Sequence, residues 1–364
     1  MKSSCGLTIN ICKPMESNDS KKRVLVVGAG GFIGGFIASE SLCRGYETWV
    51  TVRESTSRRW LADDRLHIVV VDYDAPAAEL AAQFSSLLPE GERWDYIIYN
   101  LGATKCVNFA DFNRINYLYL KNFVEALREA GKMPERLLFM SSLSALGPGD
   151  EKNYTPLTDT TIPNPNTRYG VSKIKAETFL ETCADLNWTI FRPTGVYGPH
   201  EQDYLMMIKS IDSHWDFGVG FRRQELTFIY VEDLVGAMFG AIDKPATLKK
   251  KYIIAEPRSY TQAEFRRLVA AELGGKRVIG VRLPMWAVYV ASTVAERWAS
   301  LKGKASTLNR DKFRIMKQRN WSCDVGPAER DFGFTVRYPL ARGLAETVKA
   351  YRAQKAEARE GQSR

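Results

Sequence analysis

The chain has 364 residues, of which 45% are hydrophobic and 26% charged, with 27 Gly and 15 Pro. This composition is typical of a globular protein with a large core, and it excludes a collagen-like or wholly disordered chain. The formal net charge is +9, and residues 297–319 hold eight Lys or Arg against one acid, so most of the excess lies in one segment.

Residues 1–22 come first along the chain. Their apolar patch, residues 7–11, is shorter than the core of an export signal and has no small-residue cleavage site, so we expect a loose tail on a cytoplasmic protein. The six cysteines are widely spaced without a C-x-x-C pair, and there are three histidines. This pattern predicts neither a disulfide framework nor a metal site. Separately, we expect no nucleic-acid partner.

Short β-branched or aromatic runs then alternate with helical patterns. The runs cover 23–27, 47–52, 66–71, 95–100, 136–141 and 188–192, and the clearest helical patterns cover 32–44, 113–130 and 169–184. This alternation predicts the α/β class, with a doubly wound parallel sheet of Rossmann type. We assign 23–200 to the Rossmann domain, with 226–256 returning to it, 201–225 and 257–350 to a smaller C-terminal lobe, and 351–364 to a polar tail.

A glycine-rich loop, Gly28-Ala-Gly-Gly-Phe-Ile-Gly34, joins the first predicted strand to the first helix. Gly28, Gly31 and Gly34 are spaced G-x-x-G-x-x-G, which allows a tight turn, close approach of a pyrophosphate and close packing of helix on strand. The backbone of Phe32 and Ile33 lies in the first helical turn, where free N–H groups and the helix dipole favour an anion. The sequence therefore predicts a dinucleotide-binding site here.

The residues that choose between NAD(H) and NADP(H) follow the second and third strands. Arg53 stands nineteen residues after Gly34, where an acid would accept the ribose 2′-hydroxyl. A guanidinium pairs with a 2′-phosphate, so the sequence favours NADP(H) and leaves NAD(H) open. Asp72 ends the third strand, next to Tyr73, and either accepts from the adenine amino group or only completes a turn.

A tyrosine can exchange a proton at neutral pH when a lysine one helical turn away lowers its pKa. The spacing Tyr-x-x-x-Lys occurs three times, at Tyr117/Lys121, Tyr169/Lys173 and Tyr351/Lys355. Only Tyr169 lies downstream of a strand that delivers a serine-rich segment, 141–147, to the carboxyl edge of the sheet, where ligands bind. We therefore interpret Tyr169 and Lys173 as the proton-transfer pair.

Together these motifs resemble the extended short-chain dehydrogenase/reductases, over about residues 23–350. The other matching segments are Asn100-Leu-Gly-Ala103, Asn116, Ser141-Ser142, Tyr169-Gly-Val-Ser-Lys173, Arg192-Pro-Thr-Gly-Val-Tyr-Gly-Pro199 and Phe228-Ile-Tyr-Val-Glu-Asp233. The resemblance implies an enzyme in which Tyr169 is the acid/base, Lys173 lowers its pKa and holds the nicotinamide ribose, and Ser142 binds the substrate oxygen. Ser144 is the alternative serine, and Asn116 braces the backbone near Lys173.

The same resemblance adds the residues Leu101, Gly102, Ala103 and Pro193 to the cofactor site. Residues 303–304, 321–324 and 332–334 are similar to the sterol-dehydrogenase-like and 3-ketosphinganine-reductase-like branch. Family members often dimerise through a four-helix contact, which leaves a homodimer open here. The lobe of residues 201–225 and 257–350 is expected to cover the substrate.

Sugar-nucleotide members of the family commonly place Asn and Arg where this chain has Gly195 and Leu226. Each lost charged hydrogen bond to a diphosphate costs about 1.5–3 kcal/mol, so a nucleotide sugar should bind poorly, although Arg222 and Arg223 offer partial compensation. The segment 204–221 is instead rich in Met and aromatic residues. We expect NADP(H)-dependent interconversion of a ketone and an alcohol on a lipid-like substrate, with a sugar-nucleotide epimerase or dehydratase, and a non-catalytic NADP(H)-binding regulator, as alternatives.

Residues 283–295 form an apolar run of thirteen residues containing Pro284, which is shorter than the roughly 20 residues that span a bilayer. Trp286, Tyr289 and Trp298 and the basic residues that follow are typical of an interfacial segment. The sequence thus raises the hypothesis that residues 283–319 contact the inner face of the membrane.

Overall fold

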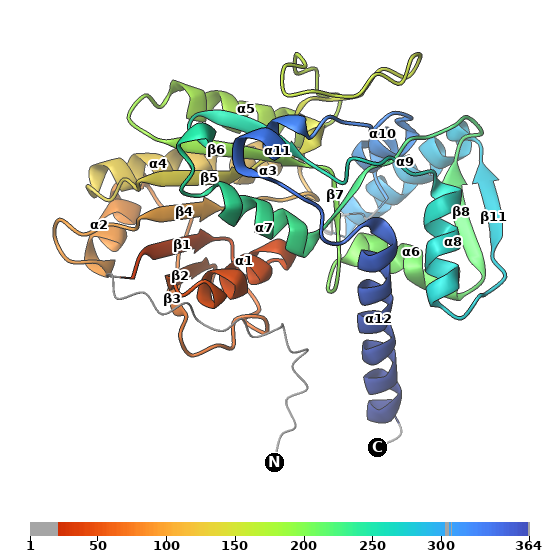
Figure 1. The fold of residues 1–364 in the computed structure, drawn as a ribbon, viewed down its shortest axis with the longest axis horizontal. Helices are drawn as coiled ribbons and strands as arrows, with labels where there is room; N and C mark the ends of the chain where they lie inside the picture. The colour runs from red at the N-terminus through yellow and green to blue at the C-terminus, as the bar shows by residue number, and fades with distance from the viewer. Residues whose placement is uncertain (1–20, 303–305, 307, 363–364) are drawn as a thin grey trace.

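A parallel sheet of seven strands forms the centre of the protein (Figure 1). The structure, a computed structural model, describes residues 21–302, 306 and 308–362. The strand order is β3-β2-β1-β4-β5-β6-β10, and all neighbours are parallel. The strands are β1 (Arg23–Val27), β2 (Glu47–Val52), β3 (His67–Val70), β4 (Tyr96–Tyr99), β5 (Arg136–Met140), β6 (Trp188–Pro193) and β10 (Lys250–Ile254). The strand order reverses between β1 and β4, which places the ligand crevice at their carboxyl ends and confirms the predicted fold class.

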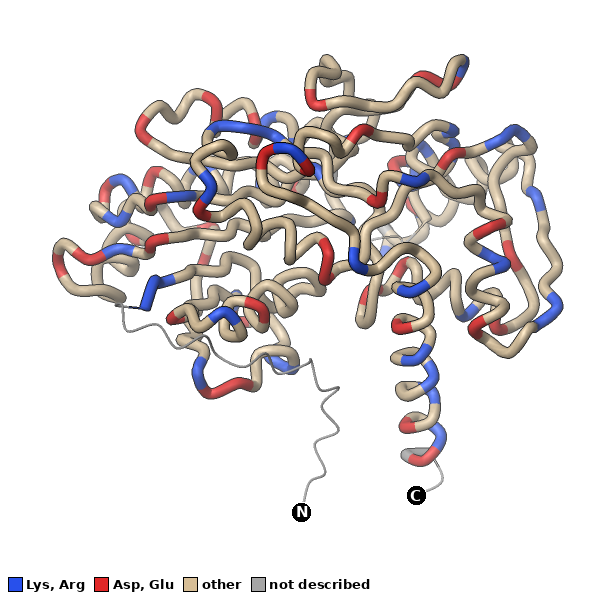
Figure 2. Tube along the Cα trace, in the orientation of Figure 1, with Lys and Arg blue, Asp and Glu red and all other residues tan. Residues whose placement is uncertain are grey.

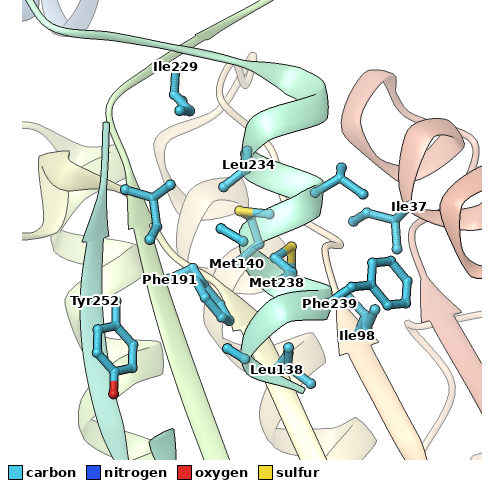
Figure 3. Close-up of a cluster of buried hydrophobic side chains, with 14 of the residues drawn as sticks. Ile37, Ile98, Leu138, Met140, Phe191, Ile229, Leu234, Met238, Phe239 and Tyr252 are labelled. Carbon is cyan, nitrogen blue, oxygen red and sulfur yellow. The ribbon is translucent and has the colours of Figure 1, made fainter. Parts of the chain in front are cut away.

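Helices cover both faces of this sheet. They are α1 (Phe32–Cys43), α2 (Ala77–Leu87), α3 (Phe109–Asn113), α4 (Tyr119–Glu129), α5 (Arg168–Thr182) and α7 (Val231–Ala241). Figure 3 shows Leu234, Met238 and Phe239 of α7 over the sheet, in a buried cluster that α1 also joins. On the opposite face α2, α4 and α5 contribute to a second cluster, so both faces of the central strands β4, β5 and β6 are buried.

The predicted helix over 113–130 is interrupted. Residues Arg114–Leu118 form a π-helical turn between α3 and α4. Such turns are rare and occur often at functional sites, because the extra residue changes the direction of the side chains. Here the turn carries Asn116, which is fully buried.

Segments of the second half of the chain outside α7, β10 and α11 (Gly326–Phe332) build the smaller lobe, around two short parallel ribbons. These pair β7 (Gly195–Tyr197) with β9 (Phe228–Tyr230) and β8 (Trp215–Val219) with β11 (Ile279–Leu283). The helices of the lobe are α6 (Gln202–Asp212), α8 (Gln262–Glu272), α9 (Met285–Leu301), α10 (Arg310–Lys317) and α12 (Leu340–Gln362). None of the helices in the described part of the chain combines the length and the hydrophobicity of a membrane span.

Two parts of the predicted division differ in the structure. Helix α11 (Gly326–Phe332), which the prediction included in the lobe, packs on the sheet, since Ala328 shares a buried cluster with Ile254 of β10. The predicted polar tail is helical as far as Gln362, and Tyr351 within it is buried and donates to Asp212 at 2.7 Å. Helix α12 forms because its apolar stripe packs in the buried cluster of the lobe, and the polar segment continues the same helix. The stripe consists of Leu340, Leu344, Val348 and Tyr351.

Candidate active site

The glycine loop lies between β1 and α1 at the carboxyl edge of the sheet. Gly28 has a φ of +83°, in the left-handed region, and a Cβ there would lie 2.8 Å from Leu101 Cα. A Cβ on Gly34 would overlap the Gly28 carbonyl oxygen, whereas at Gly31 the nearest atom would be 3.7 Å away. Gly28 and Gly34 are therefore required by packing within the protein, while Gly31 leaves an open backbone beside the first turn of α1. These features fit the pyrophosphate of a dinucleotide.

Tyr73 supports this loop from inside the protein. The Gly28 N–H donates to Thr51 Oγ1 at 3.2 Å, and Thr51 Oγ1 lies 2.6 Å from the Tyr73 hydroxyl. Tyr73 is almost fully buried, and burial raises its pKa, so the phenol stays protonated. Tyr73 is thus linked to the glycine loop indirectly, by its hydrogen bond with Thr51.

The residues expected at the adenosine end follow β2 and β3. Arg53 is exposed, and its backbone N–H donates to Thr56 Oγ1 at 3.2 Å. Asp72 is also exposed, and its carboxylate accepts the Asp74 N–H at 3.0 Å. Asp72 therefore completes a turn, as one of the two interpretations expected, and its contact with adenine stays a prediction.

Asn116 ties together the segment after β4 and the helix α5. Its side-chain oxygen accepts the Ala103 N–H at 2.7 Å, and its amide donates to the Ala103 carbonyl at 3.0 Å and to Ser172 Oγ at 2.9 Å. A Cβ on Gly102 would lie 3.0 Å from both Asn116 Oδ1 and Lys173 Nζ. The bracing role expected for Asn116 thus has a structural basis, and Gly102 is positioned directly against Lys173.

Tyr169, Lys173 and Ser142 come together at the carboxyl end of β5. Thr167 caps α5 by accepting the Gly170 N–H at 3.0 Å, which places Tyr169 in the first turn. Lys173 Nζ donates to the Met140 carbonyl at 2.7 Å and lies 6.0 Å from the centroid of the Tyr169 ring. Ser142 lies close enough to Tyr169 to influence the pKa of the phenol, which fits the role expected of it, and Ser144 stays the alternative serine.

The pKa values in this cluster have physical causes that can be named. Burial lowers the pKa of Lys173 to about 8, and the Glu177 carboxylate opposes that change. Desolvation raises the pKa of Tyr169, and the hydrogen bond with Ser142 opposes it. Lys173 Nζ donates to the Met140 carbonyl, and the lowering of the tyrosine pKa by Lys173 that the resemblance implies stays a prediction.

A buried ion-pair network lies behind Lys173, and the sequence analysis missed it. Glu177 and Arg192 are essentially inaccessible, and Arg192 Nη2 donates to Glu177 at 2.6 Å. Ser141 also donates to Glu177, and Lys251 Nζ lies 3.7 Å from the same carboxylate. One signal was present in the sequence: Tyr169, Lys173 and Glu177 recur at intervals of four and so share one helix face.

Ion pairs also join the lobe to the sheet near Tyr169. Asp203 at the start of α6 binds Lys105, which follows β4, at 2.5 Å and Lys312 of α10 at 2.8 Å. Asp311 of α10 accepts the Arg168 N–H at 3.0 Å, one residue before Tyr169. Helix α10 is thereby fixed beside the beginning of α5.

The positions that distinguish sugar-nucleotide enzymes are filled by apolar packing. A Cβ on Gly195 would overlap the Tyr204 hydroxyl, and both Tyr204 and Leu226 pack against the buried cluster of the lobe. Arg223 forms an ion pair with Glu225. Pro193, at the end of β6, is buried beside Ile254 of β10, so a direct contact with the cofactor stays a prediction.

The model of the NAD dependent epimerase/dehydratase family matches residues 24–255, which is more than half of the chain. The chain therefore belongs to this family of NAD(P)-dependent enzymes, as the extended short-chain dehydrogenase/reductase resemblance predicted. Two curated relatives act, by their names, on lipids. The chain is 25% identical over 337 residues to the ceramide reductase of Caulobacter vibrioides, covering 93% of this chain and 96% of that one. It is 26% identical over 231 residues, 60% of each chain, to the decarboxylating sterol-4-alpha-carboxylate 3-dehydrogenase of Bos taurus.

Solved structures resemble the protein in fold. The UDP-glucose 4-epimerase of Thermotoga maritima, with UDP-glucose, has a TM-score of 0.72 at 20% identity and covers 91% of this chain and 99% of its own. The Thermus thermophilus UDP-glucose 4-epimerase, in complex with NAD, has a TM-score of 0.71 at 19% identity, covering 91% of this chain and 99% of its own. At these identities the likeness supports the Rossmann architecture alone.

Proposed function

We propose that this protein is an NADP(H)-dependent oxidoreductase that interconverts a ketone and a secondary alcohol on a bulky, largely apolar lipid. Sphingoid-type lipids such as 3-ketosphinganine or a ketoceramide lead the proposal, and ketosteroids follow. The observation that carries it is the packing of Tyr204 against Gly195 and of Leu226 in the lobe core, because these side chains occupy the positions expected of diphosphate-binding groups. The two lipid-acting relatives support the same choice.

In this proposal the chain's own groups stabilise and protonate the reacting oxygen. The Ser142 hydroxyl donates a hydrogen bond to the substrate oxygen, and the Tyr169 phenol donates its proton there as negative charge develops. Lys173, held by Met140 and adjacent to Gly102, keeps a positive charge below the site and contacts the ribose. When bound, the nicotinamide supplies or accepts the hydride.

The raised pKa of Tyr169 is compatible with this role. A phenol that is protonated at neutral pH is ready to act as the acid when a ketone is reduced. In the reverse direction the phenolate must form first, so the Lys173 ammonium has to stabilise it.

The preference for NADP(H) rests on Arg53. Its exposed position directly after β2 is the one from which a side chain reaches the ribose of a dinucleotide in this fold. A guanidinium binds a 2′-phosphate through paired hydrogen bonds. Residues 28–34, 101–103 and Asn116 complete the proposed cofactor site, and a homodimer stays a prediction from the resemblance.

The deciding experiment is spectrophotometric cofactor oxidation with the full chain. Each assay contains NADPH or NADH and one of 3-ketosphinganine, a ketoceramide, a ketosteroid or UDP-glucose. We expect turnover with a lipid ketone and NADPH. Conversion of UDP-glucose without net cofactor oxidation, together with no lipid turnover, would replace this proposal with the epimerase alternative.

A further inference from the structure

Helix α9 exposes a continuous apolar stripe. Trp286, Val290, Val294 and Trp298 recur every four residues and are 72%, 53%, 61% and 65% exposed, and Leu301 follows at 85%. The opposite face of the helix is packed: Val288 and Ser292 are buried, and the Tyr289 ring lies 5.5 Å from that of Phe313 on α10. The stripe is therefore the outward face of a helix that is anchored from behind.

The ribbon β8–β11 adds a second apolar surface next to this stripe. Trp215 and Phe217 alternate outward on β8 and stack with centroids 6.2 Å apart, and Ile279 of β11 is the register partner of Trp215. All three are exposed. A Cβ on Gly220, directly after β8, would lie 3.0 Å from Met285 at the start of α9, so the ribbon leads into the helix.

Several large apolar side chains are exposed on these two elements. The largest apolar patch on a typical monomer covers about 300–600 Å², and aromatic side chains bury about 150–250 Å² each when covered. The ribbon and the α9 stripe together expose four aromatic residues, Trp215, Phe217, Trp286 and Trp298, beside the aliphatic residues of the stripe. Such a surface marks a binding site.

The charges beside this surface identify its partner. Residues 276–302 contain five Lys or Arg and one acid, and of the five, Lys276 pairs with Asp212 and Arg282 donates to Gln262 of α8. That acid, Glu296, faces inward and pairs with Arg310 at 3.0 Å and Arg168 at 3.7 Å. Lys302 lies over the Trp298 ring at 3.8 Å, and Arg297 is exposed. Figure 2 shows basic residues along the outer edge of the lobe, on β11 and the loop before it.

Two copies of this chain joined through this face would bring like charges together, which is unfavourable. An anionic bilayer complements both features, because its headgroups attract Lys and Arg while Trp side chains enter the interface. We propose that the α9 stripe and the outer face of the β8–β11 ribbon dock the protein on an anionic lipid surface. This inference rests on the proposed function in one respect: the lipid surface is taken to be the source of the lipid substrate.

The docking face is connected directly to the active site. Glu296 on α9 pairs with Arg168, the residue before Tyr169, and α10 holds the Arg168 backbone through Asp311. A protein docked by α9 therefore keeps the beginning of α5 close to the lipid surface.

The test is co-sedimentation of the full chain with vesicles of phosphatidylcholine alone or mixed with phosphatidylglycerol. We expect binding to the mixed vesicles, at least tenfold weaker binding for Trp286→Ser/Trp298→Ser, and a similar loss for Arg297→Glu/Lys302→Glu. The matched control is Ile162→Ser, which removes an 86% exposed apolar side chain from the loop before α5 and should bind as the parent protein does. Salt should weaken the binding, since the attraction to the headgroups is screened.

Activity on a detergent-dispersed substrate separates this inference from the proposed function. The tryptophan and charge variants should retain that activity while losing vesicle binding. Equal sedimentation of the parent and all variants, or a dimer that the tryptophan variant dissociates without any vesicle binding, would overturn the docking proposal. Failure of all lipid ketones in the assay would instead overturn the proposed function and leave vesicle binding measurable.

Discussion

The carboxyl edge of β5 and the outer face of α9 differ in which groups they bury: the first buries charged side chains, and the second exposes apolar ones. Around Lys173, charged groups are buried and each is held by a partner: Lys173 by Met140, and Glu177 by Arg192. On α9, Trp286 and Trp298 are exposed, and their apolar surface faces solvent. Buried charge and exposed apolar surface both cost free energy, so their presence indicates function in each region.

The difference also predicts how the two regions respond to mutation. In the buried network one lost group leaves its partner without compensation, so effects on stability should be large. On the exposed face a polar substitution removes no packing within the chain, so stability should change by about 0.5 kcal/mol or less while membrane binding changes greatly.

The strongest test of the buried region is Tyr169→Phe, which removes the phenolic oxygen and keeps the ring. General acid catalysis contributes about 10²–10⁴-fold, so kcat should fall by at least about 100-fold. Circular dichroism and cofactor binding should stay unchanged. The matched control is Tyr117→Phe, from another Tyr-x-x-x-Lys pair, whose ring contacts Phe179 outside the proposed site. Equal kcat for parent and Tyr169→Phe would favour the non-catalytic regulator.

The second test concerns the stability of the buried ion pair. Glu177→Ala leaves the Arg192 guanidinium buried beside a cavity, which should lower the free energy of unfolding by about 3–5 kcal/mol. Glu181→Ala is the control, since Glu181 pairs with Lys251 at the surface and should cost about 0–1 kcal/mol. Urea denaturation measures both. Equal losses in the free energy of unfolding for the two variants would show that burial does not determine how much this network stabilises the protein.

The contrast explains which features the sequence could predict. The glycine loop and the Tyr169/Lys173 pair are local patterns, whose residues lie within one loop or one helix. The Glu177–Arg192 pair joins α5 to β6 on the face of the sheet that α5 covers, and no spacing rule selects Arg192 as the partner. The helix beyond residue 351 was missed because its apolar stripe is narrow. The partner of Tyr351, Asp212 of α6, also lies far away in the sequence.

A smaller effect is expected at the exposed adenosine end. Arg53→Asp should lower the ratio of NADPH to NADH affinity by about 10- to 100-fold, since a charged hydrogen bond contributes about 1.5–3 kcal/mol. Fluorescence titration of each reduced cofactor measures the ratio. Arg65→Asp is the control for the change in charge, because Arg65 is engaged with Asp63. An unchanged ratio after Arg53→Asp would remove Arg53 from cofactor selection.

The smallest expected effect is a shift in the pH profile, and it links the ion-pair network to catalysis. Lys173 has a pKa of about 8, so kcat/KM for reduction should decline above that pH as the ammonium loses its proton. The Glu177 carboxylate stabilises this ammonium, so Glu177→Gln, which keeps the side-chain shape and removes the charge, should move the decline to lower pH. A shift of about half a unit to one unit would correspond to roughly 0.7–1.4 kcal/mol of interaction.

A purely structural role for Glu177 would lower the amount of folded enzyme at every pH and leave the midpoint of the decline in place. The control Glu181→Gln should leave the midpoint unchanged, because Glu181 is partly exposed and pairs with Lys251. A midpoint that moves to higher pH would contradict the sign of the interaction, since removing a negative charge cannot favour the charged form of a nearby lysine. The direction of the shift thus decides whether the buried network tunes Lys173 or only holds α5 against β6.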